Sequence, residues 1–169
     1  MSASVSARAV ALVTGAARGG GIDIAFLGMG EADSAGNVNV SHLGGNLIGP
    51  GGFIEIAQNA KKVVFCGTFD AQGARLEWSE GGLKVVQPGK VRKFVEHVER
   101  ITFAAAYARR TGQEVLYITE RAVFRLAGQG LELTEVAPGI EIERDILPFM
   151  DFRPRISSVA TMPASVFAG

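Results

Sequence analysis

The chain has 169 residues, and its 17 Lys and Arg balance 17 Asp and Glu, so its formal net charge is zero. Apolar residues make up 47% of it, which excludes a disordered chain and is enough to fill the core of one domain. The neutral balance argues against electrostatic nucleic-acid binding, the single cysteine excludes a disulfide framework, and no apolar run approaches the roughly 18–20 residues of a membrane span.

The first 19 residues are rich in small side chains, and we expect them to form an atypical leader. They lack the basic start and apolar core of a secretory signal, so we predict a cytoplasmic protein. Ala9 to Val13 is a predicted strand that leads into a glycine-rich turn, Thr14 to Gly21. This turn resembles the T-G-x-x-x-G-x-G cofactor turn of short-chain dehydrogenases, which implies nucleotide binding.

That dehydrogenase resemblance covers only about a dozen residues and lacks its required context. A helix should follow the turn, but the apolar run Ile22 to Leu27 predicts a buried strand. The family's tyrosine with a lysine four residues on is also missing, since Thr111 follows Tyr107 and Arg121 follows Tyr117 at that spacing. A plain glycine-rich turn is the competing interpretation.

The first half of the chain continues with alternating short elements. A turn at Asp33–Asn37 precedes a short strand around Val38 and Val40, and a glycine-dense loop follows at residues 44–52. We then predict a short amphipathic helix or turn over Phe53–Asn59 and a buried strand over Val63–Phe65.

The second half is dominated by hairpin patterns. We predict one hairpin from Arg75–Trp78 and Leu83–Val86, a second around Gly128–Gly130, and strands at 115–118, 123–126 and 131–136. Residues 91–110 are ambiguous, because Val91, Phe94, Val95, Val98 and Ile101 have helical spacing whereas 101–103 suit a strand. A short helix over Glu141–Met150 follows, its last turn doubtful because of Pro148. The pattern favours an α/β fold: an open mixed sheet with flanking helices and β-hairpins.

Several separated motifs between residues 20 and 157 point to one family. They are G-I-D-I-A-F-L-G-M-G-E-A-D-S-A-G-N-V-N-V-S, G-P-G-G-F-I-E-I-A-Q-N-A-K-K-V-V-F-C-G-T-F, K-V-R-K-F-V-E-H-V-E-R-I-T-F, V-L-Y-I-T-E-R-A-V-F-R-L, L-T-E-V-A-P-G-I and D-I-L-P-F-M-D-F-R-P-R-I. In this order they resemble the C-terminal, β-subunit-like part of family I coenzyme A transferases of the acetate/propionate type. The resemblance implies a single partial domain over 20–157, followed by a surface tail at 158–169.

The resemblance also implies a chemistry. Family members move CoA from an acyl-CoA to a short-chain carboxylic acid, as in fatty-acid and ketone-body metabolism, through a glutamyl-CoA intermediate. Backbone N–H groups of a glycine-rich segment stabilise the oxyanion. Here that segment corresponds to Gly49-Pro50-Gly51-Gly52, so Gly49, Gly51 and Gly52 are the candidate oxyanion and acyl-CoA-binding residues. We expect no metal and no cofactor other than the CoA thioester substrate.

One departure from the family limits this expectation. The family's nucleophile lies upstream in a Glu-Ser-Gly or Glu-Asn-Gly motif, and this sequence contains neither. The nearest look-alike, Ser79-Glu80-Gly81, falls in a predicted hairpin, so we assign no catalytic residue and expect the isolated chain to be inactive. It would act in a homo-oligomer or with a partner chain that carries the glutamate. The alternative is a non-catalytic acyl-CoA-binding or assembly subunit.

The remaining reactive side chains have less specific interpretations. We expect surface roles for Glu31 and Asp33, a buried inert thiol at Cys66, and no metal site from His42 and His97. Glu120-Arg121 is expected to be a structural ion pair in a strand-to-strand turn. Three basic pairs are expected to be solvated, with CoA phosphates as the alternative partner: Lys61-Lys62, Arg92-Lys93 and Arg109-Arg110.

Overall fold

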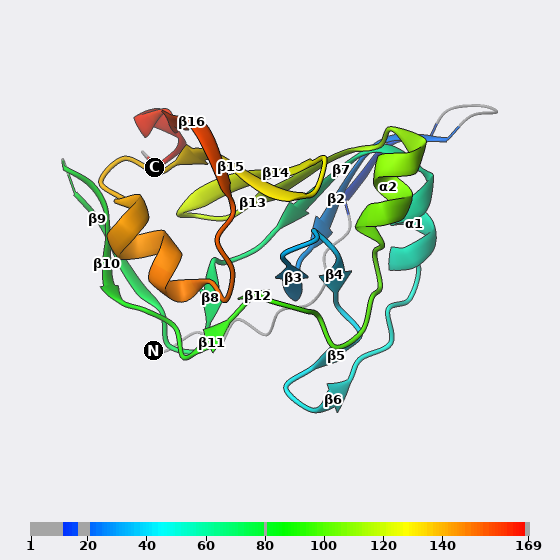
Figure 1. Cartoon of the computed structure of the whole chain (residues 1–169), viewed down its shortest axis with the longest axis horizontal. Coiled ribbons are helices and arrows are strands. Elements are labelled where there is room, and N and C mark those ends of the chain that lie inside the picture. The colour runs from blue at the N-terminus through cyan, green and yellow to red at the C-terminus, as the bar shows by residue number, and fades with distance from the viewer. Residues whose placement is uncertain (1–11, 17–20, 80, 168–169) are drawn as a thin grey trace.

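The structure, a computed structural model, describes residues 12–16, 21–79 and 81–167. Its framework is a seven-stranded sheet in the order β1-β2-β7-β13-β14-β15-β16 (Figure 1). The strands are β1 (Leu12–Ala16), β2 (Ile22–Gly28), β7 (Ala60–Cys66), β13 (Glu114–Ile118), β14 (Ala122–Ala127), β15 (Gly130–Val136) and β16 (Arg155–Thr161). The expected mixed α/β sheet is confirmed.

The centre of the sheet is parallel and its second half is a meander. β7 pairs in parallel with both β2 and β13, whereas β13, β14 and β15 pair antiparallel in sequence. The apolar run Val63–Phe65 of β7 is fully buried, as a parallel strand covered on both faces requires. At the ends of the sheet, β1 pairs antiparallel with β2, and β16 pairs in parallel with β15.

Two short helices flank the parallel strands. They are α1 (Phe53–Asn59) and α2 (Ala105–Thr111), and both lie at the same end of the molecule in Figure 1. Gln113 connects them, because its Nε2 donates to the carbonyls of Ala57 at 2.6 Å and Ala60 at 2.5 Å. α2 ends at Gly112, whose φ of 69° is the left-handed conformation that favours glycine.

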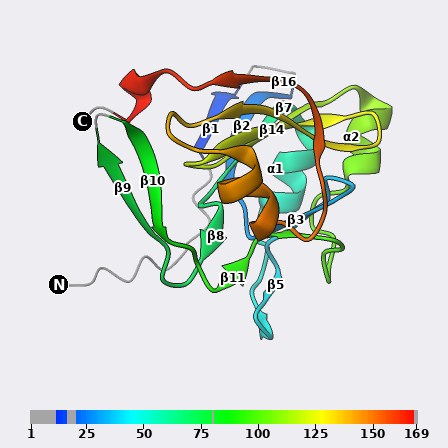
Figure 2. The ribbon, with the colours of Figure 1, turned by 60° about the vertical axis from the view of Figure 1, so that its left-hand side comes forward.

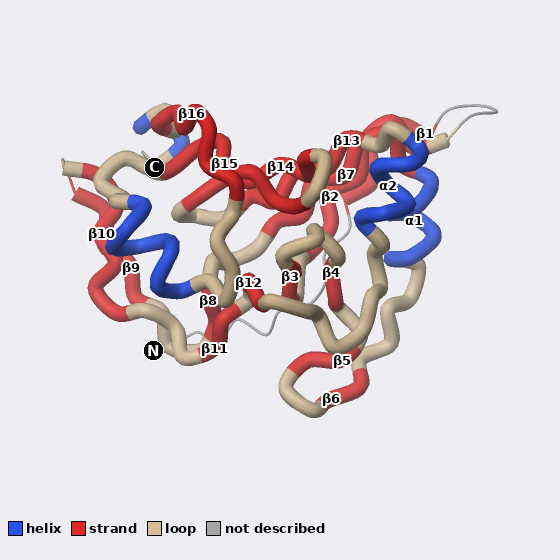
Figure 3. The backbone as a smooth tube through the Cα atoms, in the orientation of Figure 1, coloured by secondary structure: helices blue, strands red, loops and turns tan. Residues whose placement is uncertain are grey.

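The smaller elements lie beside this framework, and Figure 3 shows the helices gathered at its two ends. The short strands are β3 (Glu31–Asp33), β4 (Val38–Asn39), β5 (His42–Leu43), β6 (Asn46–Leu47), β8 (Asp70–Ala71), β9 (Arg75–Ser79), β10 (Gly82–Gln87), β11 (Val91–Arg92) and β12 (Phe94–Val95). Three further helical turns are η1 (Ile142–Ile146), η2 (Leu147–Phe149) and η3 (Ala164–Val166). The predicted hairpin of β9 and β10 extends away from the sheet (Figure 2).

The helical interpretation of the segment from Val91 to Ile101 is wrong. This stretch forms β11, which pairs with β8, and β12, which pairs in parallel with β3. Pairing with strands from the first half of the chain overrides the local spacing, and the α2 helix begins only at Ala105. Phe103, in the strand-like part of the segment, bridges to Val38.

Two other predictions need adjustment at their boundaries. Glu141–Met150 is not one α-helix: η1 is a π-helical turn and η2 a 3₁₀ turn, and Pro148 fits the start of η2, where no N–H is needed. β16 spans 155–161 and crosses the boundary at residues 157 and 158, where we expected the domain to end and the surface tail to begin, although most of its residues are exposed.

Aromatic side chains fill the core beneath the parallel strands. The Phe65 ring lies 5.9 Å from Phe53, 5.0 Å from Phe103 and 5.4 Å from Tyr117, centroid to centroid. The Tyr117 hydroxyl is buried and donates to the carbonyl of Gly36 in the β3–β4 turn. The core therefore ties the sheet to the small β12-β3-β4 sheet.

Candidate functional site

Three parallel strands end at one edge of the sheet. β2, β7 and β13 run in the same direction, so the residues that follow them lie side by side. The Met29 N–H donates to the Cys66 carbonyl at 3.0 Å, and the Gly67 N–H donates to the Ile118 carbonyl at 3.1 Å. In open α/β sheets, ligands bind outside the carboxyl ends of parallel strands, so this edge is the first place to seek a site.

The glycine segment lies toward this same edge. α1 leads directly into β7 and packs on β2 and β7, so it runs back along the sheet and begins near the carboxyl edge. The turn before it is closed by the Phe53 N–H, which donates to the Pro50 carbonyl at 3.1 Å. Gly51 has φ of 54°, which by itself favours glycine.

The surroundings of these glycines are open. A Cβ added at Gly49 or Gly51 would meet nothing within 4 Å, and at Gly52 it would meet only the Ile56 Cδ1 at 3.6 Å. The fold's own packing therefore does not demand glycine at positions 49 and 52. Within the described residues the N–H groups of Gly51 and Gly52 have no hydrogen-bond acceptor, so both are available to a ligand.

A depression of about 470 Å³ adjoins the glycine segment. Its wall is largely apolar, and Leu47 (77% exposed) and Ile101 (58% exposed) are unusually accessible for such side chains. It is lined by Ser41, Leu47, Ile48, Gly49, Pro50, Ile54, Arg100, Ile101 and Thr102.

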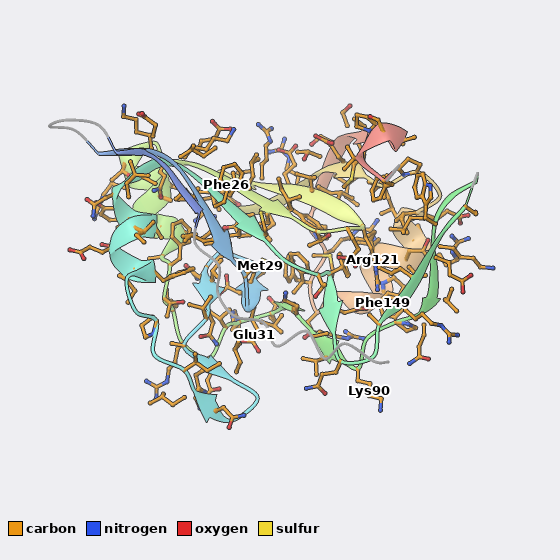
Figure 4. The ribbon with its side chains drawn as sticks, turned by 180° about the vertical axis from the view of Figure 1, so that it is seen from behind. Phe26, Met29, Glu31, Lys90, Arg121 and Phe149 are labelled. Atoms are coloured by element: carbon orange, nitrogen blue, oxygen red, sulfur yellow. The ribbon has the colours of Figure 1, made fainter. Side chains whose placement is uncertain are left out.

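A buried charge cluster follows the carboxyl ends of β7 and β13. The Arg121 guanidinium is fully buried; its Nη2 donates to Asp70 Oδ2 at 2.8 Å, and its Nε lies 3.3 Å from Glu120 Oε1. Figure 4 shows Arg121 beside Phe149, and the rings of Phe149 and Phe69 flank the guanidinium at 5.7 and 5.0 Å. The expected Glu120–Arg121 ion pair is confirmed, with Asp70 as an additional partner.

Burial changes the pKa of Glu120. Removal of its carboxylate from water raises the pKa of Glu120, although the Phe69 N–H, which donates to Oε2 at 2.9 Å, and the nearby Arg121 both oppose this. Sequence reasoning missed Asp70. The available clue was that Asp70 follows the β7 strand just as Glu120 and Arg121 follow β13, so that all three reach one edge.

Lys93 lies in the same region. Its burial contradicts the prediction that the Arg92-Lys93 pair is solvated. Its partner in sequence, Arg92, is accessible and donates to Asp151 Oδ1 at 2.5 Å, but Lys93 is only 8% exposed. Removal of the ammonium from water lowers the pKa of Lys93, an effect that Glu120 and Asp70 oppose. Lys93 therefore is not part of a solvated face.

The predictions for Glu31, Asp33 and Cys66 agree only in part with the structure. Asp33 is buried, and its side chain accepts from the Asn37 N–H at 2.8 Å and Nδ2 at 3.0 Å, so it holds a turn rather than a surface position. Glu31 is half-buried and accepts from Asn39 Nδ2 at 3.1 Å; Figure 4 places it near Met29. Cys66, the last residue of β7, is exposed, so the prediction of a buried thiol is wrong.

Two sequence look-alikes do not form a site in the structure. Thr14 pairs with Ile24 inside a strand, and β2 rather than a helix follows, so the context of a dehydrogenase turn is not met; residues 17–20 lie outside the described ranges. Ser79 and Gly81 flank the turn between β9 and β10, and Glu80 lies outside the described residues.

Two further findings concern the described part of the chain alone. None of its helices has the length and apolar character to cross a membrane. It also holds no group of three His, Cys, Asp or Glu side chains arranged for a metal ion, and His42 instead pairs with Glu99 at 2.6 Å between Nδ1 and Oε2.

The chain is similar in sequence to known CoA-transferases. No family model matches the chain. It is 49% identical over 145 residues to the caffeate CoA-transferase of Acetobacterium woodii, covering 83% of this chain and 28% of that protein. It is 47% identical over 139 residues to the acetate CoA-transferase YdiF of Escherichia coli K12, covering 82% of this chain and 26% of that protein.

The fold agrees with this relationship. The crystal structure of the acyl-CoA transferase YdiF from E. coli O157:H7, as a thioester complex with CoA, superimposes with a TM-score of 0.85 and 45% identity over 88% of this chain and 29% of that one. The chain thus spans little more than a quarter of each of these three proteins. In sequence and in fold, this chain is similar to part of a CoA-transferase, as its motifs predicted.

Proposed function

We propose that this chain is the acyl-CoA-binding, oxyanion-stabilising part of a CoA-transferase that moves CoA from an acyl-CoA to a short-chain carboxylic acid. The observation that carries this proposal is the open backbone of Gly49–Gly52 at the carboxyl edge, in a chain similar to enzymes named for CoA transfer. The relatives' names supply acetate and caffeate as acceptor acids, and a small carboxylate such as acetate is our choice here.

The chemistry needs a donor where negative charge develops. A glutamate carboxylate attacks the thioester carbonyl carbon, and the carbonyl electron pair moves onto oxygen as the new C–O bond forms. The intermediate then expels the CoA thiolate and leaves an acyl-glutamyl anhydride. The thiolate attacks the glutamyl carbonyl and releases the first acid, and the second acid repeats these steps in reverse. The free N–H groups of Gly51 and Gly52 would donate to the oxyanion in each attack.

The nucleophile in this proposal comes from another polypeptide segment. Neither Glu-Ser-Gly nor Glu-Asn-Gly occurs in the 169 residues. Glu55 is exposed on α1, and Glu31 is engaged by Asn39, so neither is placed as an activated nucleophile. We propose that a different polypeptide segment, which carries the glutamate, completes the active site.

The same observations favour a second candidate, a non-catalytic acyl-CoA-binding or assembly subunit. The two functions share thioester binding and differ in turnover. Mixing the chain with a glutamate-bearing partner should restore transfer of CoA to acetate under the first proposal, and binding without turnover would favour the second.

Adding a single methyl group at Gly52 tests whether the glycine segment binds the acyl-CoA. Gly52→Ala keeps an ordinary φ of −77° and places its Cβ 3.6 Å from Ile56, so the fold should tolerate it, while the methyl obstructs the approach to the N–H. We expect acetyl-CoA affinity, measured by calorimetry, to fall by about tenfold or more. Gly128→Ala, in another open position, is the matched control and should bind like the unmodified chain. Equal affinities for all three proteins would refute the assignment.

A further inference from the structure

The Lys93 side chain is held at the carboxyl edge by its backbone. Its carbonyl accepts from the Ala32 N–H at 2.8 Å, and the next residue, Phe94, accepts from the Asp151 N–H at 2.9 Å. The ammonium then reaches across to β7: Nζ lies 2.8 Å from the position that a Cβ of Gly67 would occupy. The same position is 3.3 Å from the Met29 carbonyl oxygen, so Lys93 reaches the point where β2 and β7 end.

The Lys93 side chain is only 8% exposed, and its ammonium forms no ion pair with a carboxylate of the described residues. No carboxylate of that part of the chain lies within 4.0 Å of its Nζ, whereas Asp70 and Glu120 both contact Arg121. An ammonium has three donors to satisfy, and a buried charge without a partner is strongly unfavourable. Arg121, which is fully buried, shows how this fold partners a charge when the partner belongs to the chain.

Because Gly67 has no Cβ, the Lys93 Nζ can lie against its backbone, with Met29 alongside. Any larger residue would place its Cβ against Nζ or displace it. The ammonium thus lies at the ends of β2 and β7, and the reaction proposed above consumes and releases carboxylates.

We propose that Lys93 is the counter-ion of a carboxylate that binds beside Gly67 at the ends of β2 and β7. This inference rests on the proposed function, which supplies two sources of the same chemistry. One is the free acid substrate, and the other is a glutamate of the polypeptide that completes the enzyme. Lys93 acts as a positioning residue, and no bond to it forms or breaks.

The test follows the Lys93 side chain directly. The chain is labelled with ¹³C at lysine Cε and titrated with acetate at constant ionic strength, using chloride to balance, while NMR monitors each lysine. We expect the Lys93 resonance to shift saturably with acetate and not with chloride. Lys90, which is exposed three residues away, should not show the same saturable shift. A parallel titration with an acetylated, amidated Ser-Glu-Asn-Gly peptide represents the protein glutamate.

Variants separate a local role from a structural one. Lys93→Met should weaken acetate binding about tenfold or more, Lys93→Arg should retain part of it, and Lys90→Met should leave it unchanged. Gly67→Ala keeps the charge but displaces the ammonium, and it should also weaken binding. Amide spectra of each variant establish that the fold is intact.

Each outcome decides the proposal. Saturation by acetate assigns the free acid, and saturation by the peptide alone assigns a protein glutamate. If neither probe shifts Lys93, or if Lys90 and Lys93 respond alike, the proposal is wrong, and Lys93 only balances the charges around Arg121. Acetyl-CoA affinity is measured on the same samples: binding of acetyl-CoA without a Lys93 response overturns this inference and leaves the proposed function standing.

Discussion

Arg121 is enclosed by two carboxylates and two aromatic rings, and it connects the start of β8 to the β13–β14 turn. The sequence predicted its pairing with Glu120 because the two are neighbours in a short turn. It could not predict Asp70, which lies 51 positions away and is brought close only by the parallel pairing of β7 with β13. For the same reason the burial of Lys93 could not be foreseen from its place in a basic pair, and Arg109 of another such pair instead donates to the carbonyls of Ala127 and Ala35.

Removal of the Arg121 charge should strongly destabilise the fold. Arg121→Met leaves the buried Asp70 and the half-buried Glu120 beside an apolar side chain, and we expect the free energy of unfolding in urea to fall by about 3–5 kcal/mol. Lys61→Met removes an exposed pair with Asp23 and should cost less than about 1 kcal/mol. A loss at Arg121 no larger than that at Lys61 would show that the buried network contributes little.

Glu120 gives the stability a defined pH dependence. Its folded pKa is raised above the ordinary value of 4.5, so the folded state binds the proton more tightly than the unfolded state does. The stability of the wild type relative to Glu120→Gln should therefore decrease as pH rises from about 4.5 through the raised pKa, and be constant below 4.5. Urea unfolding at several pH values measures this difference. An increase with pH would mean that Arg121 lowers the pKa instead.

The elements form three groups that differ in how far the sequence specifies them. The strands β2 and β7 were predictable because continuous apolar runs such as Val63–Phe65 fit only a strand buried on both faces. The hairpins were predictable from their turn residues. The segment from Val91 to Ile101 was not, because its apolar residues meet different neighbours in turn, β8 and then β3, and no single period describes that. The open position of Gly49–Gly52 was expected from the family resemblance, and its ligand remains a prediction.

Asn37 couples the β3–β4 turn to the α2 helix. Its Oδ1 accepts from the Ala105 N–H at 2.9 Å, although Ala105 is 68 positions away, and this helix start has no capping side chain of its own. Asn37→Ala should lower the unfolding free energy by about 1–2 kcal/mol and speed amide exchange in α2. Asn46→Ala, in the exposed β5–β6 hairpin, should leave both unchanged. Unaltered exchange in α2 after Asn37→Ala would contradict the coupling.

At the scale of the molecule, the chain presents an apolar surface beside its candidate site. Leu47 and Ile101 lie on that surface, in a chain that spans little more than a quarter of its relatives. Because such contiguous apolar area favours association in water, we expect the apparent mass in sedimentation velocity to rise with concentration.

Charged substitutions on the apolar surface test whether self-association occurs through it. The double variant Leu47→Glu, Ile101→Glu should shift the distribution toward monomer, whereas Val166→Glu, on the exposed η3 turn elsewhere in the molecule, should not. A wild-type monomer at every concentration would show that this surface does not mediate self-association.

The central claim is that the chain binds an acyl-CoA but carries no nucleophile of its own. Native mass spectrometry of the chain with acetyl-CoA, followed by denaturation of the same sample, tests both halves at once. We predict a complex in the native spectrum that dissociates on denaturation and leaves the unmodified mass. A CoA adduct that survives denaturation would contradict the account by revealing a nucleophile within these 169 residues, and no complex at all would contradict the binding role.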